Sequence, residues 1–224
     1  MATGARTAMR TEIDATLVLM QWLSPAYPVG AFAYSHGLEA AVEAGWVSDA
    51  RGLEDWLSDV LLHGTGRNDA LLIAAAYRAE TRLEVDEIDT TARAFAPSKE
   101  RLTEADRIGA AFGDTTGAIW ATDLAGLVYP VALGRAARLE GLPQALTATL
   151  HLQAFTSNLI AAGQRLLPVG QTEGQAMLRR LSALCPQIAA DTDAGDLSEL
   201  ASTAFLTDIA SMRHETQYSR IFRT

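Results

Sequence analysis

The chain has 224 residues, of which 49% are apolar and 20% charged, and its formal net charge is −9. This composition supports a sizeable buried core and excludes a disordered chain, while the acidic balance argues against general binding to a phosphate backbone. The single cysteine, Cys185, cannot form a disulfide within the chain and is typical of a reducing compartment.

The N-terminal residues do not resemble a targeting segment. Arg6 and Arg10 are followed at once by Glu12 and Asp14, and the next apolar run is short and lacks a small-residue cleavage site. No stretch approaches the ~20 apolar residues that cross a membrane. We therefore expect a cytoplasmic protein.

Helical periodicity starts near the N-terminus. Ile13, Leu17 and Met20 recur at spacings of four and three residues, and the sequence Ser24-Pro25 predicts the end of that helix. A second helix is indicated by a one-sided apolar stripe with Asp49 as its N-cap. The stripe consists of Leu53, Trp56, Leu57, Val60 and Leu61.

Two more helices follow after the turn "HGTGRND". Asn68 or Asp69 is placed to cap the apolar segment "ALLIAAAYRAE", and Ser98 is placed to cap the next helix. One face of the helix after Ser98 carries Leu102, Ala105, Gly109 and Phe112.

The second half of the chain shows the same period. Pro143 suits the first turn of a helix of more than twenty residues, "QALTATLHLQAFTSNLIAAGQRLL". Thr172 and Gln175 fit a capping box for a following helix that ends at "CP". The polar segment "DTDAGDLSE" predicts a loop, and a last helix over about 199–213 leads into the tail.

Strand patterns, fixed-period repeats and low-complexity segments are not found in the sequence. We therefore expect an all-α fold: one domain over residues 1–224, built as a bundle of about eight to ten helices. The loops near 64–68 and 190–197 are its weakest joints.

A short stretch, "YSHGLE", contains the residue types of a hydrolytic triad in Ser35, His36 and Glu39. The hydrolase motif G-x-S-x-G is absent, and adjacent residues of a helix point about 100° apart, so serine and histidine would not face each other. We expect no catalytic residues, with Ser35 capping or lining the helix and Tyr34 equally placed to pack.

Local motifs for metals and nucleotides are missing as well. The four histidines, His36, His63, His151 and His214, lie in separate segments and form no i, i+3 or i, i+4 pair. No phosphate-binding P-loop is present. We predict no metal site and no cofactor, with direct metal binding by these histidines as the alternative that equilibrium dialysis would test.

The C-terminal segment "MRHETQYSRIFRT" reverses the acidic character of the chain. Arg213, Arg220 and Arg223 alternate there with Tyr218, Ile221 and Phe222. Arginine and tyrosine are favoured anchors at protein interfaces, and a terminus is the part most prone to order on docking. Binding a partner and folding back on the acidic body are equally supported by this chemistry.

Four blocks of the sequence resemble the UreF family of urease accessory proteins. They are "SPAYPVGAFAYSHGLEAAVEAGWV", "YPVALGRAARLEGLP", "SNLIAAGQRLLPVGQTEGQ" and "DIASMRHETQYSRIFRT", which together span residues 24–224. Ala33 and His36 depart from the serine and glutamine expected in the family, and "RIFRT" stands for the usual "RLFRS".

The resemblance implies an all-α cytoplasmic protein that is not an enzyme. Proteins of this family are expected to act in urease maturation as a scaffold and regulator that bridges UreD (called UreH in some organisms) and the GTPase UreG. The complex couples GTP hydrolysis to nickel insertion into apo-urease, and the scaffold tends to pair as a homodimer.

The same resemblance nominates site residues. For contact with UreD it points to the C-terminal block: His214, Glu215, Tyr218, Arg220, Phe222 and Arg223. The first block is expected to lie near the C-terminal block or near the dimer and UreG surfaces, and from it the resemblance points to Tyr34, Ser35, His36 and Glu39. Arg165, Gln171 and Gln175 are either structural or face UreG. Deleting residues 214–224 is expected to leave the fold intact and to abolish co-purification with UreD.

Overall fold

A computed structural model describes residues 13–224 of the chain; residues 1–12, with Arg6, Arg10 and Glu12, lie outside the described residues. The all-α prediction is confirmed, because no strand occurs among residues 13–224. Within the same range, no helix is both long and apolar enough to span a membrane.

The described part contains nine longer helices, within the expected eight to ten, and two shorter ones. The first helix covers residues 13–22. The others are α2 (Leu38–Glu43), α3 (Ala50–His63), α4 (Thr65–Arg78), α5 (Arg82–Ala94), α6 (Lys99–Trp120), α7 (Tyr129–Leu139), α8 (Gln144–Leu166), α9 (Gln171–Leu181), α10 (Cys185–Asp191) and α11 (Phe205–His214), with 3-10 turns η1 (Ala31–Ala33) and η2 (Leu197–Glu199).

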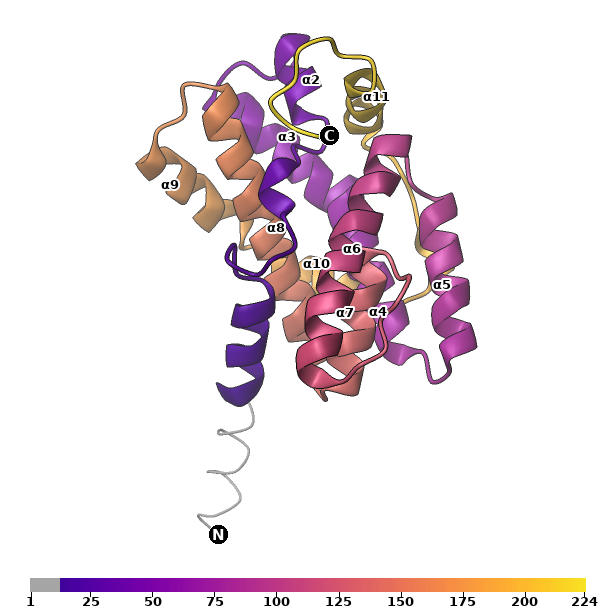
Figure 1. The fold of residues 1–224 in the computed structure, drawn as a ribbon. Helices are drawn as coiled ribbons and strands as arrows, with labels where there is room; N and C mark the ends of the chain where they lie inside the picture. Colours follow the sequence, from indigo (N-terminus) through magenta and orange to yellow (C-terminus); the bar gives the residue numbers. More distant parts are fainter. Residues whose placement is uncertain (1–12) are drawn as a thin grey trace.

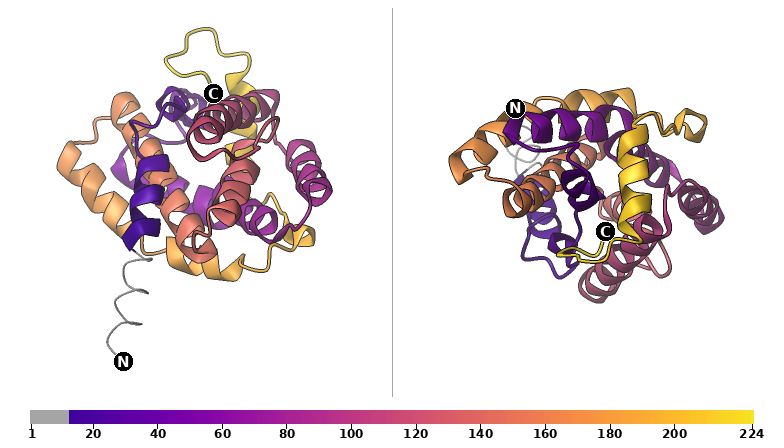
Figure 2. Two further views of the ribbon diagram at one scale, coloured as in Figure 1. Left: turned by 60° about the horizontal axis from the view of Figure 1, so that its bottom comes forward. Right: turned by 90° about the horizontal axis from the view of Figure 1, so that it is seen from above.

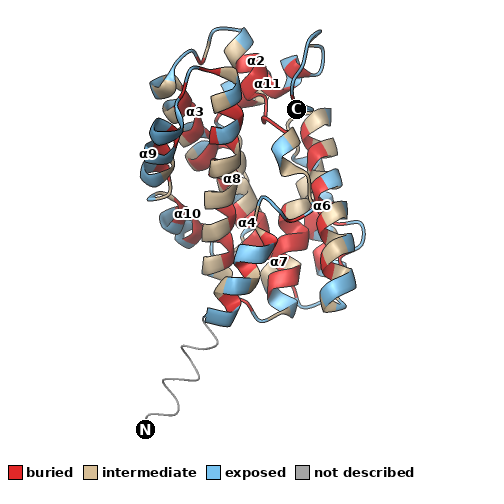
Figure 3. Ribbon diagram, turned by 60° about the vertical axis from the view of Figure 1, so that its left-hand side comes forward, coloured by how far each residue is buried: buried red, intermediate tan, exposed pale blue. Residues whose placement is uncertain are grey.

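The helices are arranged around the tightly packed pair α4 and α7 (Figure 1). The long helix α8 packs against α4 and against α9 and α10, while α6 covers the other side of α7. Figure 3 shows the buried residues along the inward faces of these helices. One hydrophobic cluster runs from Ala15 to Phe222, so the two ends of the described chain share a core.

Close helix packing depends on a glycine in α7. A Cβ built on Gly134 would lie 2.3 Å from the main-chain oxygen of Ile73 in α4. Only a residue without a side chain lets the two backbones approach this closely. Gly134 is therefore required for the close packing of α7 against α4.

Two of the predicted helix caps are confirmed, and the cap predicted at Asn68 or Asp69 is wrong. The side chain of Asp49 accepts a hydrogen bond from Gly52 N–H at 2.8 Å, and that of Ser98 accepts one from Arg101 N–H at 3.2 Å. By contrast, α4 starts at Thr65, because the chain turns at the non-helical Gly64 alone. Asn68 and Asp69 consequently lie inside α4, and residues 65–68 of the predicted loop are helical.

The side chain of Asn68 has a different use. Its amide donates to the carbonyl of Ala201 at 2.8 Å and accepts from Ala201 N–H at 3.3 Å. These two bonds hold the segment before α11 against α4. A cap that was not predicted lies at Thr81, which forms a complete capping box with Glu84 at the start of α5.

The capping box predicted at Thr172 and Gln175 is also wrong. Helix α9 starts at Gln171, with Gly170 as an N-cap that forms no side-chain hydrogen bond, so Thr172 is already inside the first turn. The "CP" expected to end this region instead opens α10, with Pro186 in its first turn. The last helix begins at residue 205 rather than near 199.

The polar segment after α10 is a loop as predicted, apart from the short turn η2. The long helix α8 covers residues 144–166 as predicted, with Pro143 as its N-cap, one residue before the first turn.

Two apolar helix faces predicted from the sequence do not coincide with the faces that are buried in the structure. In the first helix, Ile13, Leu17 and Met20 are more than half exposed, while Leu19 and Trp22 are fully buried. The apolar spacing of Ile13, Leu17 and Met20 therefore marks an outward face.

In α6, Gly109 and Phe112 are buried as expected, but Leu102 and Ala105 are only half-buried. The charged residues Arg101 and Glu104 are buried there in their place.

Candidate functional site

The tail, residues 215–224, folds back across the segment 33–39 and the N-terminus of α6 (Figure 1). Arg223 N–H donates to the carbonyl of Ala33 at 2.8 Å, and Ser35 donates to the carbonyl of Thr224 from its N–H at 2.8 Å and its hydroxyl at 2.5 Å. The side chains of Phe222 and Thr224 are buried. Of the two alternatives left open by the sequence, the described chain adopts the folded-back one.

Glu39 is the main acceptor for the tail. Its carboxylate accepts from Ile221 N–H at 2.7 Å and from Phe222 N–H at 2.9 Å. The imidazole of His214 is fully buried between two carboxylates: Nε2 lies 3.3 Å from Glu39 Oε2, and Nδ1 lies 2.7 Å from Glu100 Oε2. Buried charges of this kind are stable only when paired and hydrogen-bonded. We call Glu39, Glu100 and His214 the clasp.

A second carboxylate, that of Glu215 in the tail, binds the N-terminus of α6. Glu215 Oε1 accepts from Lys99 N–H at 2.8 Å and from Glu100 N–H at 3.3 Å. These are free amides at a helix N-terminus, where negative charge is favoured. Arg220 adds an ion pair with Glu100 Oε1 at 2.6 Å.

Under the tail lies a buried charged cluster of His36, Arg101 and Glu104. Arg101 donates to His36 Nδ1 at 2.7 Å and pairs with Glu104, whose Oε1 lies 3.1 Å from the same ring nitrogen. The hydroxyl of Thr224 donates to Glu104 Oε2 at 2.7 Å. The cluster thus joins the end of the tail to α6 and to the "YSHGLE" segment.

The protonation of this cluster follows from burial and charge. Desolvation and then the neighbouring Arg101 lower the pKa of His36, so the ring is neutral and accepts from the guanidinium. Burial alone would raise the pKa of Glu104, but the charge of Arg101 and its hydrogen bond outweigh burial and hold that pKa far below its ordinary value. The cluster therefore holds one cation and one anion.

Ser35 and His36 are not arranged as nucleophile and base. The Ser35 hydroxyl donates to the Thr224 carbonyl and accepts from Glu39 N–H at 3.2 Å, so it lines the start of α2 as expected. The His36 ring faces Arg101 and Glu104, with its backbone in the left-handed region at φ 60°. Tyr34 is buried, which is the packing role considered for it.

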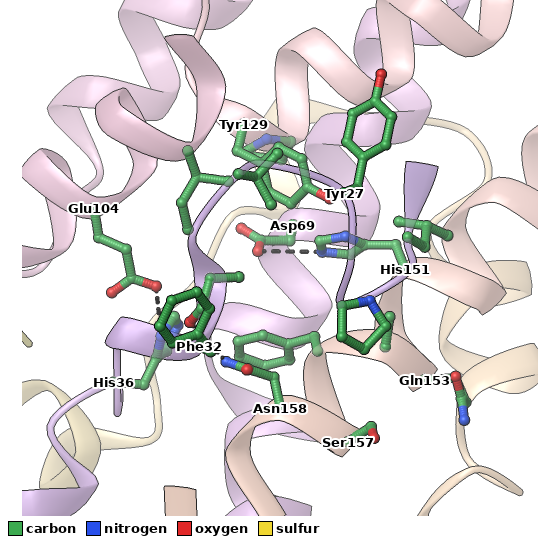
Figure 4. Close-up of a pocket in the computed structure, with 18 of the residues that line it drawn as sticks. Tyr27, Phe32, His36, Asp69, Glu104, Tyr129, His151, Gln153, Ser157 and Asn158 are labelled. Carbon is green, nitrogen blue, oxygen red and sulfur yellow. Dashed lines mark hydrogen bonds and ion pairs between the residues drawn. The ribbon is translucent and has the colours of Figure 1, made fainter. Parts of the chain in front are cut away.

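Next to the cluster lies a cavity of about 380 Å³ between the segment 22–36 and helices α6, α7 and α8. Figure 4 shows His36 and Glu104 at one wall and the Asp69–His151 pair near the centre, with His151 Nε2 3.4 Å from Asp69 Oδ2. The ring of Tyr129 lies 5.6 Å from that of His151. Burial and the charge of Asp69 raise the pKa of Tyr129, so its phenol is neutral.

The structure gives no metal-binding arrangement in the part of the chain it describes. Among residues 13–224 no group of three His, Cys, Asp or Glu side chains is placed to hold an ion. His36 and His214 are each held by carboxylates or arginine, and His151 faces Asp69. His63 is exposed at the end of α3.

The nominated partner-binding residues divide into two groups. His214, Phe222, Tyr34, Ser35, His36 and Glu39 are buried in the folded-back arrangement, whereas Glu215, Tyr218, Arg220 and Arg223 are exposed. Tyr218 is the most exposed of these. A deletion of 214–224 would remove buried side chains, so the expectation that it leaves the fold intact conflicts with this packing. Contact of either group with a partner stays a prediction.

The third nominated set, Arg165, Gln171 and Gln175, also lies in two different places. Arg165 donates to the carbonyl of Phe32 at 3.3 Å, and its guanidinium lies 5.7 Å from the centre of the Phe222 ring. Gln171 and Gln175 are exposed on α9. The structure thus places Arg165 beside the tail and the two glutamines apart from it.

Three residues of α6 that receive the tail were not predicted from the sequence: Glu100, Arg101 and Glu104. The helical spacing of two of them could have indicated their burial. Arg101 and Glu104 continue the buried stripe of Ile108 and Phe112 by helical spacing, which makes them charged residues on a core face. Such residues need buried partners, and the partners are the tail and His36.

Comparisons with known proteins agree with the sequence blocks. The UreF family model matches residues 47–182. The urease accessory protein UreF of Ruegeria pomeroyi is 57% identical over 208 residues, covering 93% of this chain and 96% of that protein. The protein of the same name from Ruegeria sp. (strain TM1040) is 61% identical over 214 residues, and that of Methylorubrum populi is 48% identical over 224. This chain therefore belongs to the UreF family of urease accessory proteins.

Proposed function

We propose that this chain acts in urease maturation as a non-catalytic scaffold that bridges UreD (UreH) and the GTPase UreG. It works in the cytoplasm as a homodimer and regulates the use of GTP during nickel insertion into apo-urease. Family membership supports the process. The more specific role is supported by the surface that the tail and α11 present to solvent.

That surface combines an apolar helix face with tail anchors. Four large apolar side chains of α11 are exposed at helical spacing, and Tyr218 and Ile221 follow in the tail. The four are Phe205, Leu206, Ile209 and Met212. Exposed apolar patches of this kind mark interaction sites in soluble proteins. Arg223 supplies an exposed guanidinium suited to a carboxylate of the partner.

The single observation that carries the proposal is the exposure of Tyr218 and Arg223 on a tail that is otherwise tightly bound to the body. Fixing the tail through Glu39 and Glu215 lowers the entropy lost when these anchors engage a partner. The tail is thus a preorganised element, with its buried residues positioning its exposed ones.

A pair of substitutions tests the role in UreD binding. The variant Tyr218→Ala/Arg223→Ala changes only exposed side chains, so the fold is retained. Loss of an aromatic and an arginine anchor is expected to reduce UreD recovered in co-purification by tenfold or more, which corresponds to at least ~1.4 kcal/mol.

The matched control is Leu83→Ala/Arg107→Ala, which also removes one exposed apolar side chain and one exposed arginine, on α5 and α6. It is expected to recover UreD at the level of the unmodified chain. Equal recovery with the tail variant and the control would refute the tail as the UreD anchor.

A further inference from the structure

The cavity beside the cluster of His36, Arg101 and Glu104 has the size and access of a small-molecule site. Its volume of about 380 Å³ lies within the ~300–1,000 Å³ range of such sites. Phe32 at its rim is 61% exposed, and no residue of 215–224 lies in its wall. A small molecule can therefore enter while the tail stays docked. Its aromatic lining includes Trp22, Tyr27, Tyr129 and Phe155.

Asp69 places a carboxylate in this aromatic interior. Its side chain is 17% exposed, and no N–H or O–H group among residues 13–224 donates a hydrogen bond to it. The side chain that faces it is His151, whose Nε2 lies 3.4 Å from Asp69 Oδ2 and forms no hydrogen bond within the same range. A carboxylate taken out of water is costly unless a cation or a hydrogen-bond donor satisfies it.

The other charged side chains of the cavity wall have partners in the chain. Arg101 and Glu104 form an ion pair with each other. Arg165 donates to the carbonyl of Phe32 at 3.3 Å. Among the described residues that line the cavity, Asp69 is thus the one carboxylate that no arginine pairs with.

Aromatic rings lie next to this carboxylate. The centre of the Tyr129 ring is 5.6 Å from that of His151, and the Phe155 ring stacks on His151 at 6.3 Å. Figure 4 shows Asp69 and His151 near the centre of the cavity with Tyr129 beside them. A negative charge next to aromatic faces suits an organic cation, because the rings attract positive charge and also bury the apolar part of the ligand.

We propose that this cavity binds a small organic ammonium ion, with its charged group at Asp69 and its apolar part against the rings of Tyr129 and Phe155. The ammonium N–H groups donate to the carboxylate, which has no other donor within the described chain. Asp69 disfavours an anion by repulsion, and a neutral apolar molecule would leave the carboxylate unsatisfied. The site is a property of the folded chain alone and does not depend on the proposed bridging of UreD and UreG.

Calorimetric titration of the purified chain with 2-phenylethylammonium tests this site. The probe has one ammonium group and one aromatic ring, and 2-phenylethanol has nearly the same shape with a neutral hydroxyl in place of the ammonium group. The ammonium probe is expected to bind saturably and at least about tenfold more tightly than the alcohol, because only the ammonium group neutralises the carboxylate of Asp69.

Two variants assign the binding to this cavity. Asp69→Asn keeps the shape of the side chain and removes its charge, so the affinities for the two probes are expected to come within about twofold of each other. Ala154→Phe, one helical turn after His151 in the cavity wall, leaves Asp69 in place and fills the space. It is expected to abolish binding of both probes. Urea unfolding of each variant checks that the fold is retained.

The matched control is Asp114→Asn, which removes an exposed carboxylate of α6 that does not line the cavity. It is expected to keep the preference for the ammonium probe that the unmodified chain shows. Because Asp114→Asn and Asp69→Asn change the net charge equally, the comparison separates the site from general attraction of cations to an acidic chain.

Three results would overturn the site. The first is that the unmodified chain shows no saturable binding of the ammonium probe up to ~10 mM. The second is a preference for the ammonium probe that survives in Asp69→Asn, and the third is binding that Ala154→Phe leaves unchanged. None of them bears on UreD recovery by the exposed tail anchors, so the proposed function is tested separately.

Discussion

Glu39 is the residue on which the tail depends most. Its two oxygens accept from two tail amides and one faces His214, so its loss leaves buried donors without acceptors. Glu39→Ala is expected to lower the free energy of unfolding in urea by about 2–3 kcal/mol. The control Glu43→Ala, at the exposed end of α2, is expected to change it by less than ~0.5 kcal/mol. Similar losses in the two variants would contradict the role assigned to Glu39.

His36 gives the fold a specific pH dependence. Burial and Arg101 lower its pKa below the ordinary value of 6.5, so the unfolded chain takes up this proton at a higher pH than the folded chain does. The stabilising effect of the neutral ring is therefore complete above pH 6.5 and is lost as pH falls toward the folded pKa.

The variant His36→Gln isolates this effect, because the other three histidines remain in both proteins. Between pH 7.5 and 5.5 the unmodified chain is expected to lose more stability than the variant, because only the unmodified chain takes up a proton at residue 36 on unfolding. Denaturant midpoints across this pH range measure the difference. Parallel curves for the two proteins would show that His36 is not held neutral by its site.

At the scale of elements, the close approach of α4 and α7 predicts that a side chain at position 134 lowers the free energy of unfolding. Gly134→Ala would put a Cβ at 2.3 Å from the Ile73 oxygen, a contact that backbone must relieve. We expect a loss of ~3 kcal/mol in unfolding free energy. Gly52→Ala in α3 is the matched control, since its Cβ meets nothing nearer than 3.4 Å and alanine favours a helix. A neutral Gly134→Ala would contradict the packing of this pair.

The elements also show which features the sequence can predict. Caps at Asp49 and Ser98 depend on bonds to residues three positions away, so local pattern suffices. Helix α4 starts directly after Gly64, which forms no side-chain cap. The polar residues Asn68 and Asp69 match the N-cap preference better than glycine does, so local pattern predicted the start too late. The outward face of the first helix could not be found by spacing, because an apolar stripe does not say which side the core covers.

The contacts of the candidate site cannot be predicted from local sequence patterns, because they join residues far apart in the chain. Glu39 and Phe222 are separated by 183 positions, and Glu104 and Thr224 by 120. The resemblance to UreF nominated residues in both the "YSHGLE" segment and the tail, and proximity of the two blocks was one of the alternatives that it implied. It did not say which bonds join them, because those follow only from the packing of α2, α6 and α11.

At the scale of the molecule, the tail and the bundle form one core, and the exposed surface of α11 adjoins it. A scaffold needs a rigid body and separate surfaces for its partners. Under the proposed function, the α11 and tail surface would supply one of them, and Gln171 and Gln175 on α9 are candidates for a second surface that faces UreG. With both engaged, the chain would link two proteins that it does not chemically change.

The most direct measurement is size-exclusion chromatography of UreD and UreG co-expressed with and without this chain. The account predicts that UreD and UreG elute in one complex only when the chain is present, and that the chain elutes with them. Substituting Tyr218→Ala/Arg223→Ala should release UreD while UreG stays with the chain. Elution of UreD and UreG together without the chain, or of the chain apart from both, would contradict the bridging role.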